Sequence, residues 1–134
     1  MEYYDVVIQN IKSKEESVIC IEAEEAEETP LIVLLTHVDG KEFIASSMCY
    51  FQAFQELKEL LLKKGYGMKC KGSLVNAVQS PMMSISDKIY LVEMGKHASL
   101  KDCVSMYEYI DIDKFASTLQ QMDYFEEWYT SIHG

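Results

Sequence analysis

The sequence has 134 residues, 49% of them hydrophobic and 25% charged, which is typical of one globular domain. It holds 22 acidic residues against 12 basic ones, giving a formal net charge of −10, and every basic residue is a lysine. The absence of arginine, whose planar guanidinium group grips phosphate through two parallel hydrogen bonds, argues against most phosphate-handling enzymes. A negative chain also repels a phosphate backbone, so we expect no nucleic-acid partner.

The negative charge is concentrated towards both ends of the sequence. Residues 1–28 hold nine acidic and two basic side chains, residues 29–101 hold six and nine, and residues 102–134 hold seven and one. If the two acidic ends meet in space, they form one surface that attracts a basic protein and speeds its association. The alternative is that the charge serves solubility alone.

Cysteine use and the absence of targeting signals predict the compartment. No run of about 18 apolar residues occurs, so we expect no membrane partner. Met1–Asp5 has neither the basic nor the apolar region of a secretory signal. Cys20, Cys49, Cys70 and Cys103 are scattered and form no C-x-x-C pair. We therefore expect a cytoplasmic domain with free thiols, no disulfide, no bound metal and no cofactor.

The first half of the sequence predicts strands followed by a helix. Apolar alternation and β-branched runs predict a strand or an extended arm at 3–11 and strands at 17–24, 31–38 and 41–46. Asp39-Gly40 is a dipeptide typical of a tight hairpin turn. A helix over about 47–64 follows, with its buried side chains at near-helical spacing: Phe51, Phe54, Leu57 and Leu61. Lys58 lies beside this stripe and is expected to keep its charged head in water.

The second half predicts further strands and a final helix. The expected elements are a strand at 68–78, one helical turn at 82–86, strands at 88–94 and 103–110, and a helix at 117–132. Gly72 marks a bulge or a close backbone approach. Thr118 and Gln121 are predicted to form the capping box of the last helix. Its expected buried stripe is Leu119, Met122, Phe125, Tyr129 and Ile132.

The order of these elements is strands, helix, strands, helix. It predicts a single α+β domain over residues 1–134, with an antiparallel or mixed sheet and two main helices. A parallel, doubly wound sheet would need regular alternation of strands and helices, which the sequence lacks.

The sequence contains no motif of the common enzyme classes. It has no phosphate-binding glycine loop, no G-x-S-x-G elbow and no H-E-x-x-H pair. Asp111-Ile112-Asp113 matches half of a calcium loop but lacks the glycine and the terminal glutamate of an EF-hand. We therefore expect a protein that is not an enzyme.

Several segments resemble small acidic bacterial immunity proteins of polymorphic or contact-dependent toxin systems. They are the helix Tyr50–Lys64, the run Cys-Lys-Gly-Ser-Leu-Val-Asn-Ala, the turn Ser80–Met83, the strand Ile89–Leu91 and the closing Gln120-x-x-x-x-Phe125-x-x-Trp128 helix. The resemblance spans about residues 43–132. It implies a cytoplasmic inhibitor that binds a cognate toxin domain stoichiometrically and has no catalytic apparatus. The alternatives are a small enzyme or ligand-binding domain with an unrecognised site, and a general regulatory interaction protein.

Crowded carboxylates give the candidate partner-binding residues. They repel one another in the free protein, so a cationic partner relieves that repulsion on binding. The predicted docking surface for a basic toxin domain consists of Glu22, Glu24, Glu25, Glu27 and Glu28, together with Asp111 and Asp113. The alternative is that the glutamates form a solvated loop and that the two aspartates form a turn before the last helix.

Overall fold

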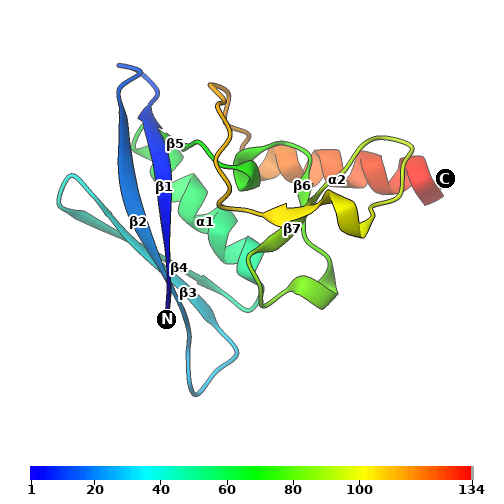
Figure 1. Cartoon of the computed structure of the whole chain (residues 1–134), viewed down its shortest axis with the longest axis horizontal. Helices are drawn as coiled ribbons and strands as arrows, with labels where there is room; N and C mark the ends of the chain where they lie inside the picture. Colours follow the sequence, from blue (N-terminus) through cyan, green and yellow to red (C-terminus); the bar gives the residue numbers. More distant parts are fainter. Residues whose placement is uncertain (134) are drawn as a thin grey trace.

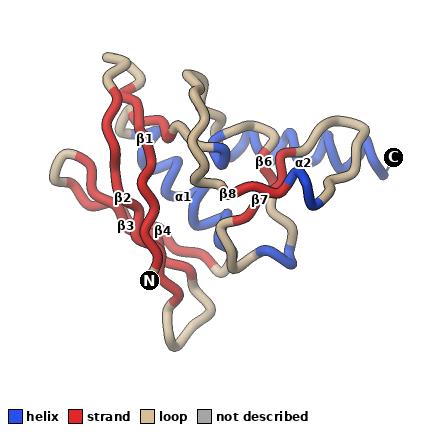
Figure 2. The backbone as a smooth tube through the Cα atoms, viewed as in Figure 1, coloured by secondary structure: helices blue, strands red, loops and turns tan. Residues whose placement is uncertain are grey.

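The computed structural model describes residues 1–133 and contains two antiparallel sheets and two main helices (Figures 1 and 2). The strands are β1 (Glu2–Asn10), β2 (Glu16–Glu25), β3 (Ile32–Val38), β4 (Lys41–Ser47), β5 (Tyr66–Met68), β6 (Ala77–Val78), β7 (Lys88–Leu91) and β8 (Cys103–Ser105). The helices are α1 (Tyr50–Lys63) and α2 (Thr118–His133), with short 3₁₀ turns η1 (Lys71–Ser73), η2 (Pro81–Met83) and η3 (Leu100–Asp102). The predicted α+β fold class is confirmed.

The larger sheet has the strand order β4-β3-β2-β1-β5. Alternate side chains of its strands are buried, among them Ile21 and Leu34, and they pack against α1. The predicted α1 stripe is confirmed, since Phe51, Phe54, Leu57 and Leu61 are all buried. Both helices and the smaller sheet lie on one side of the larger sheet (Figure 1). The other side, here called the outer face, carries neither of these helices nor the smaller sheet, and Tyr3, Val18 and Ile44 are exposed on it.

The hairpin turn between β3 and β4 is confirmed at Asp39-Gly40. Both residues have positive φ angles, 50° and 79°, as a two-residue turn of this hand requires. The turn sets Val38 opposite Lys41 and Leu34 opposite Ala45. This register places Leu34 and Ala45 on the buried face, while Leu35 and Ile44 face outward.

The predicted strand at 68–78 is wrong, because the backbone turns at Gly72. A Cβ atom at Gly72 would lie 2.7 Å from the Phe54 ring, so only glycine allows the chain to pass this close to α1. The Gly72 N–H donates to the carbonyl of Met106 at 2.8 Å. The segment is therefore split into β5, η1 and β6, and the predicted close backbone approach is confirmed.

The smaller sheet has the order β6-β7-β8, and its strands are shorter than predicted. β7 ends at Leu91 rather than residue 94, and β8 ends at Ser105 rather than residue 110. After β7, Val92 exchanges hydrogen bonds with Asn76: the Val92 N–H donates to the Asn76 carbonyl, and Asn76 Nδ2 donates to the Val92 carbonyl, both at 3.1 Å. One backbone bond and one side-chain bond thus continue the contact between the two segments beyond the end of β7.

The capping box of α2 lies one residue earlier than predicted. The Gln120 N–H donates to Ser117 Oγ at 3.1 Å, and the Ser117 N–H donates to Gln120 Oε1 at 2.9 Å. Ser117 is therefore the N-cap, and Thr118 and Gln121 do not form the predicted pair. Gln121 is free to point into the protein instead.

The predicted buried stripe of α2 is wrong for four of its five residues. Leu119, Met122, Phe125 and Tyr129 are between 41% and 67% exposed. The buried residues of α2 are Gln121 and Trp128. Trp128 packs with Val78 and Val92 in a second small core, and its Nε1 donates to the Lys96 carbonyl at 2.8 Å. Burial of the large Trp128 ring, with its N–H hydrogen-bonded, therefore decides which side of α2 faces the protein, and the apolar periodicity does not.

Lys58 joins α1 to the start of α2, contrary to the expectation that its head lies in water. Its side chain is almost fully buried. Nζ donates to the Ala116 carbonyl at 2.8 Å and to Thr118 Oγ1 at 3.3 Å. Burial lowers the pKa of Lys58 to about 8. The neighbouring Glu59 carboxylate accepts a hydrogen bond from the Thr118 N–H at 2.6 Å, so Glu59 satisfies one backbone donor at the start of α2.

A tyrosine cluster joins β1, α1 and the segment after β8. The Tyr107 ring stacks on Tyr4 with centroids 4.2 Å apart, and its hydroxyl lies 3.1 Å from the Tyr50 hydroxyl. Burial raises the pKa of Tyr50 to about 12 and the pKa of Tyr107 well above its ordinary value. Both hydroxyls therefore stay protonated in the folded protein at pH values where the unfolded chain releases their protons.

This shift predicts alkaline destabilisation. Above about pH 10, unfolding releases the Tyr107 proton, so the free energy of unfolding falls by about 1.4 kcal/mol per pH unit for this group. Tyr107→Phe removes that contribution, so its stability should fall less steeply than that of the wild type between about pH 9 and about pH 11. Urea unfolding at both pH values measures this. Tyr3→Phe, at an exposed position, is the matched control, and equal slopes for all three proteins would contradict the prediction.

Candidate functional site

The five predicted glutamates lie together at one end of the larger sheet. Glu22, Glu24 and Glu25 belong to β2, and Glu27 and Glu28 follow in the β2–β3 loop. All but Glu22 are exposed, and Glu22 is half-buried. Among residues 1–133, none of the five takes part in a salt bridge or a side-chain hydrogen bond. Their charges are therefore unpaired within the described chain.

Glu22 lies in a row of outward-facing residues that crosses four strands. The register places Tyr3 of β1 opposite Glu22, Glu22 opposite Leu35 of β3, and Leu35 opposite Ile44 of β4. Tyr3 is 61% exposed and Ile44 is 54% exposed. Large apolar side chains and an acidic group thus share the outer face. Of the four exposed glutamates, Glu24 faces outward like Glu22, Glu25 alternates to the opposite face, and Glu27 and Glu28 lie in the loop. We call the row, together with these four glutamates at the end of the sheet, the acidic sheet surface.

Asp111 and Asp113 do not join the acidic sheet surface. Asp111 Oδ1 accepts a hydrogen bond from Lys69 Nζ at 2.6 Å, and Glu16 accepts another from the same atom at 2.7 Å. These ion pairs raise the pKa of Lys69. Glu16 starts β2 whereas Glu24 is near its end, and eight residues of strand span roughly 27 Å. Asp113 lines the same pocket as Asp111. The predicted single surface is therefore corrected: the structure separates the two aspartates from the glutamates.

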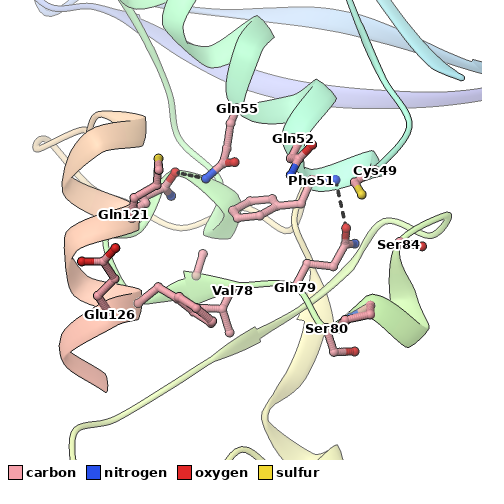
Figure 3. A pocket seen from close by; sticks show the side chains of 14 residues that line it. Cys49, Phe51, Gln52, Gln55, Val78, Gln79, Ser80, Ser84, Gln121 and Glu126 are labelled. Carbon is pink, nitrogen blue, oxygen red and sulfur yellow. Dashed lines mark hydrogen bonds between the residues drawn. The ribbon is translucent and has the colours of Figure 1, made fainter. Parts of the chain in front are cut away.

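A cleft of about 500 Å³ opens between the amino-terminal half of α1, β6, η2 and α2 (Figure 3). Its walls combine apolar side chains with four glutamine amides. The lining residues are Cys49, Phe51, Gln52, Gln55, Ala77, Val78, Gln79, Ser80, Pro81, Ser84, Gln121, Met122, Phe125 and Glu126. A mostly apolar pocket of this volume with a few polar groups is typical of a binding site.

Two glutamines fix the shape of the cleft. Gln121 Nε2 donates to the carbonyls of Gly72 and Leu74, both at 2.8 Å, and Gln121 Oε1 accepts from Gln55 Nε2 at 3.0 Å (Figure 3). Gln79 Oε1 accepts from the Phe51 N–H at 3.0 Å, at the start of α1. Because these amides are satisfied by the protein itself, the walls are held in place before anything binds.

The charge on the cleft walls is negative. Glu126 is the only acidic residue of the lining, and the lining contains no lysine and no histidine. Asp123 and Glu127 lie on the same helix as Glu126 and are exposed. Within residues 1–133, no group of three or more histidine, cysteine or acidic side chains is arranged to hold a metal ion. The cleft therefore suits a neutral or cationic group better than an anion.

Sequence reasoning missed this cleft. It assigned Met122 and Phe125 to the core, whereas both line the opening. No pattern in the sequence marks it, because the burial of Gln121 and the exposure of Met122 become apparent only in the structure.

Neither the protein-family models nor the curated proteins that were compared with the sequence give a match. Among the described residues, no helix has the length and apolar character needed to cross a membrane.

Proposed function

We propose that this chain is a protein-binding domain that docks a basic protein on the acidic sheet surface. We further propose that the partner is a toxin domain, which the chain inhibits as an immunity-type protein. The observation that carries the first proposal is that exposed Tyr3 and Ile44 on the outer sheet face lie in register with Glu22, beside a group of unpaired glutamates at the end of β2. The resemblance to immunity proteins supports the second.

The two kinds of side chain have different roles in such a complex. Buried apolar and aromatic side chains supply most of the affinity of a protein interface, and tyrosine is enriched among the residues that dominate it. Charges around them raise the association rate and select partners of opposite sign. Tyr3 is therefore the proposed anchor, and Glu24–Glu28 the proposed attracting group.

The test is a charge-matched comparison of association rates. The surface variant replaces Glu24, Glu25, Glu27 and Glu28 with glutamine, which changes the formal net charge from −10 to −6. The partner is isolated by co-purification from the native cells, identified by mass spectrometry and produced separately. At low salt, association with the surface variant is expected to be about tenfold slower than with the wild type. The salt dependence of the rate should also become flatter.

The matched control removes four exposed carboxylates that lie on neither proposed binding surface: Glu15→Gln, Glu56→Gln, Glu93→Gln and Glu108→Gln. It has the same net charge as the surface variant, so equal slowing in both would show that total charge, not the acidic sheet surface, sets the rate. A wild-type rate in the surface variant would remove the loop from the interface. The inhibitor role requires that cells expressing the partner survive only when the chain is also expressed.

A further inference from the structure

The exposed stripe of α2 and the cleft form one continuous apolar surface. Met122 and Phe125 line the cleft, and Leu119 and Tyr129 extend the same exposed side of the helix. The stripe runs over eleven residues of α2, from Leu119 to Tyr129, or about 15 Å of helix. We call the cleft together with these four side chains the α2 groove.

A line of carboxylates borders the α2 groove. Asp123 follows Leu119 by one helical turn, and Glu126 follows Met122 by one turn, so each acid lies beside an exposed apolar residue. Glu127 adds a third charge on the exposed side. A second copy of this chain, stacked on the stripe, would bring like charges together. Charge complementarity therefore favours a basic occupant.

We propose that the α2 groove is a docking site for a basic amphipathic helix of a protein partner. One apolar side chain of that helix enters the cleft between Phe51, Met122 and Phe125, and its lysine or arginine residues face Asp123 and Glu126. This is the helix-in-groove mode of recognition, in which apolar anchors repeat at helical spacing. Methionine suits such a surface because its flexible thioether adapts to the inserted side chain.

This site is separate from the acidic sheet surface. The two share no residue, and α2 lies on the side of the larger sheet opposite to its outer face (Figure 1). The inference therefore stands on the groove alone and does not depend on the proposed inhibitor function.

The probe is a synthetic helical peptide of leucine and lysine, about four turns long, with leucine at helical spacing. Its counterpart carries glutamate in place of lysine. The lysine peptide is expected to bind and to shift the methyl resonance of Met122. The glutamate peptide should bind at least about tenfold more weakly. Equal binding of the two peptides would overturn the proposal, since charge complementarity is its basis.

Three variants locate the bound peptide. Phe125→Ser and Met122→Ser should each weaken the lysine peptide by about tenfold or more, because each removes an apolar wall. Val18→Ser is the matched control, since Val18 is similarly exposed but lies on β2 outside both proposed binding surfaces, and it should leave the affinity unchanged. Circular dichroism checks the fold of each variant. Met122→Ser, at the more exposed of the two positions, keeps the test valid if Phe125→Ser unfolds.

The glutamine surface variant distinguishes the two proposals. If it weakens the lysine peptide as much as Phe125→Ser does, the peptide lies on the acidic sheet surface and the groove proposal is wrong. If the peptide keeps its affinity for the surface variant and shifts Met122, the groove proposal is supported. The proposed function is tested separately, by the association rate of the natural partner, so either peptide result leaves that test unaffected.

Discussion

Phe54→Ala is expected to lower the free energy of unfolding by about 3–5 kcal/mol. The Phe54 ring is fully buried. It lies where α1 contacts the chain segments around Gly72 and Tyr107. It packs edge-on against Tyr107 with centroids 5.7 Å apart and stacks beside Phe51 at 5.9 Å. It also covers Gly72. Alanine would leave a cavity that these rigid neighbours cannot fill.

Urea unfolding at neutral pH measures this loss. Phe125→Ala is the matched control, because it removes the same ring from a position that is 41% exposed, and it should cost less than half as much. Equal losses in the two variants would show that Phe54 is not the centre of the core. A loss below about 1 kcal/mol for Phe54→Ala would contradict the prediction outright.

Trp128→Ala is expected to cost about 3–5 kcal/mol and to loosen α2. Trp128 is the largest buried side chain of that helix, and the second small core consists of Trp128 with Val78 and Val92. Its removal also leaves the Lys96 carbonyl without the indole donor. The remaining attachments of α2 are mostly hydrogen bonds near its start, so the carboxyl-terminal turns should open first.

Hydrogen exchange resolves this effect along the helix. In Trp128→Ala, backbone amides from residue 125 onwards should exchange faster, while those of α1 should change little. Tyr129→Ala is the control at the adjacent, exposed position, and it should leave the exchange pattern unchanged. Trp128→Phe keeps an aromatic ring and loses the N–H, so it should lie between the wild type and alanine. Uniform acceleration over the whole chain would contradict a separate role for Trp128 in holding α2.

The first half of the fold is predictable because local and tertiary preferences agree there. Asp39-Gly40 has the positive φ angles that its hairpin turn needs, and Phe54 and Leu57 lie on the predicted side of α1. The alternation of β2 also predicts which of its side chains face inward. Glu22 and Glu24 could therefore be placed on one face of a strand from the sequence alone.

The fold of the second half cannot be predicted in the same way, because individual contacts between distant residues determine where its elements begin, end and face. The chain needs a glycine at position 72 because the Phe54 ring lies against the backbone there, and this contact cannot be read from the sequence. The rotation of α2 follows from Ser117 as its cap and from Gln121 and Trp128 as its anchors, against the apolar periodicity. The cleft consists of residues from four separate elements, so no local pattern marks it. Asp111 is separated from Glu24 by the length of β2, which sequence spacing does not reveal.

The register of β1 against β2 has a practical consequence for handling the protein. Glu2 pairs with Ala23, so the amino end of the described chain lies on the strand next to Glu22 and Glu24. An affinity tag joined ahead of Met1, especially one rich in histidine or lysine, would sit on the acidic sheet surface and compete with a basic partner. The last described turn of α2 ends far from this point (Figure 1). A tag placed after α2 leaves the outer face clear, so capture and surface-immobilisation experiments should use that end.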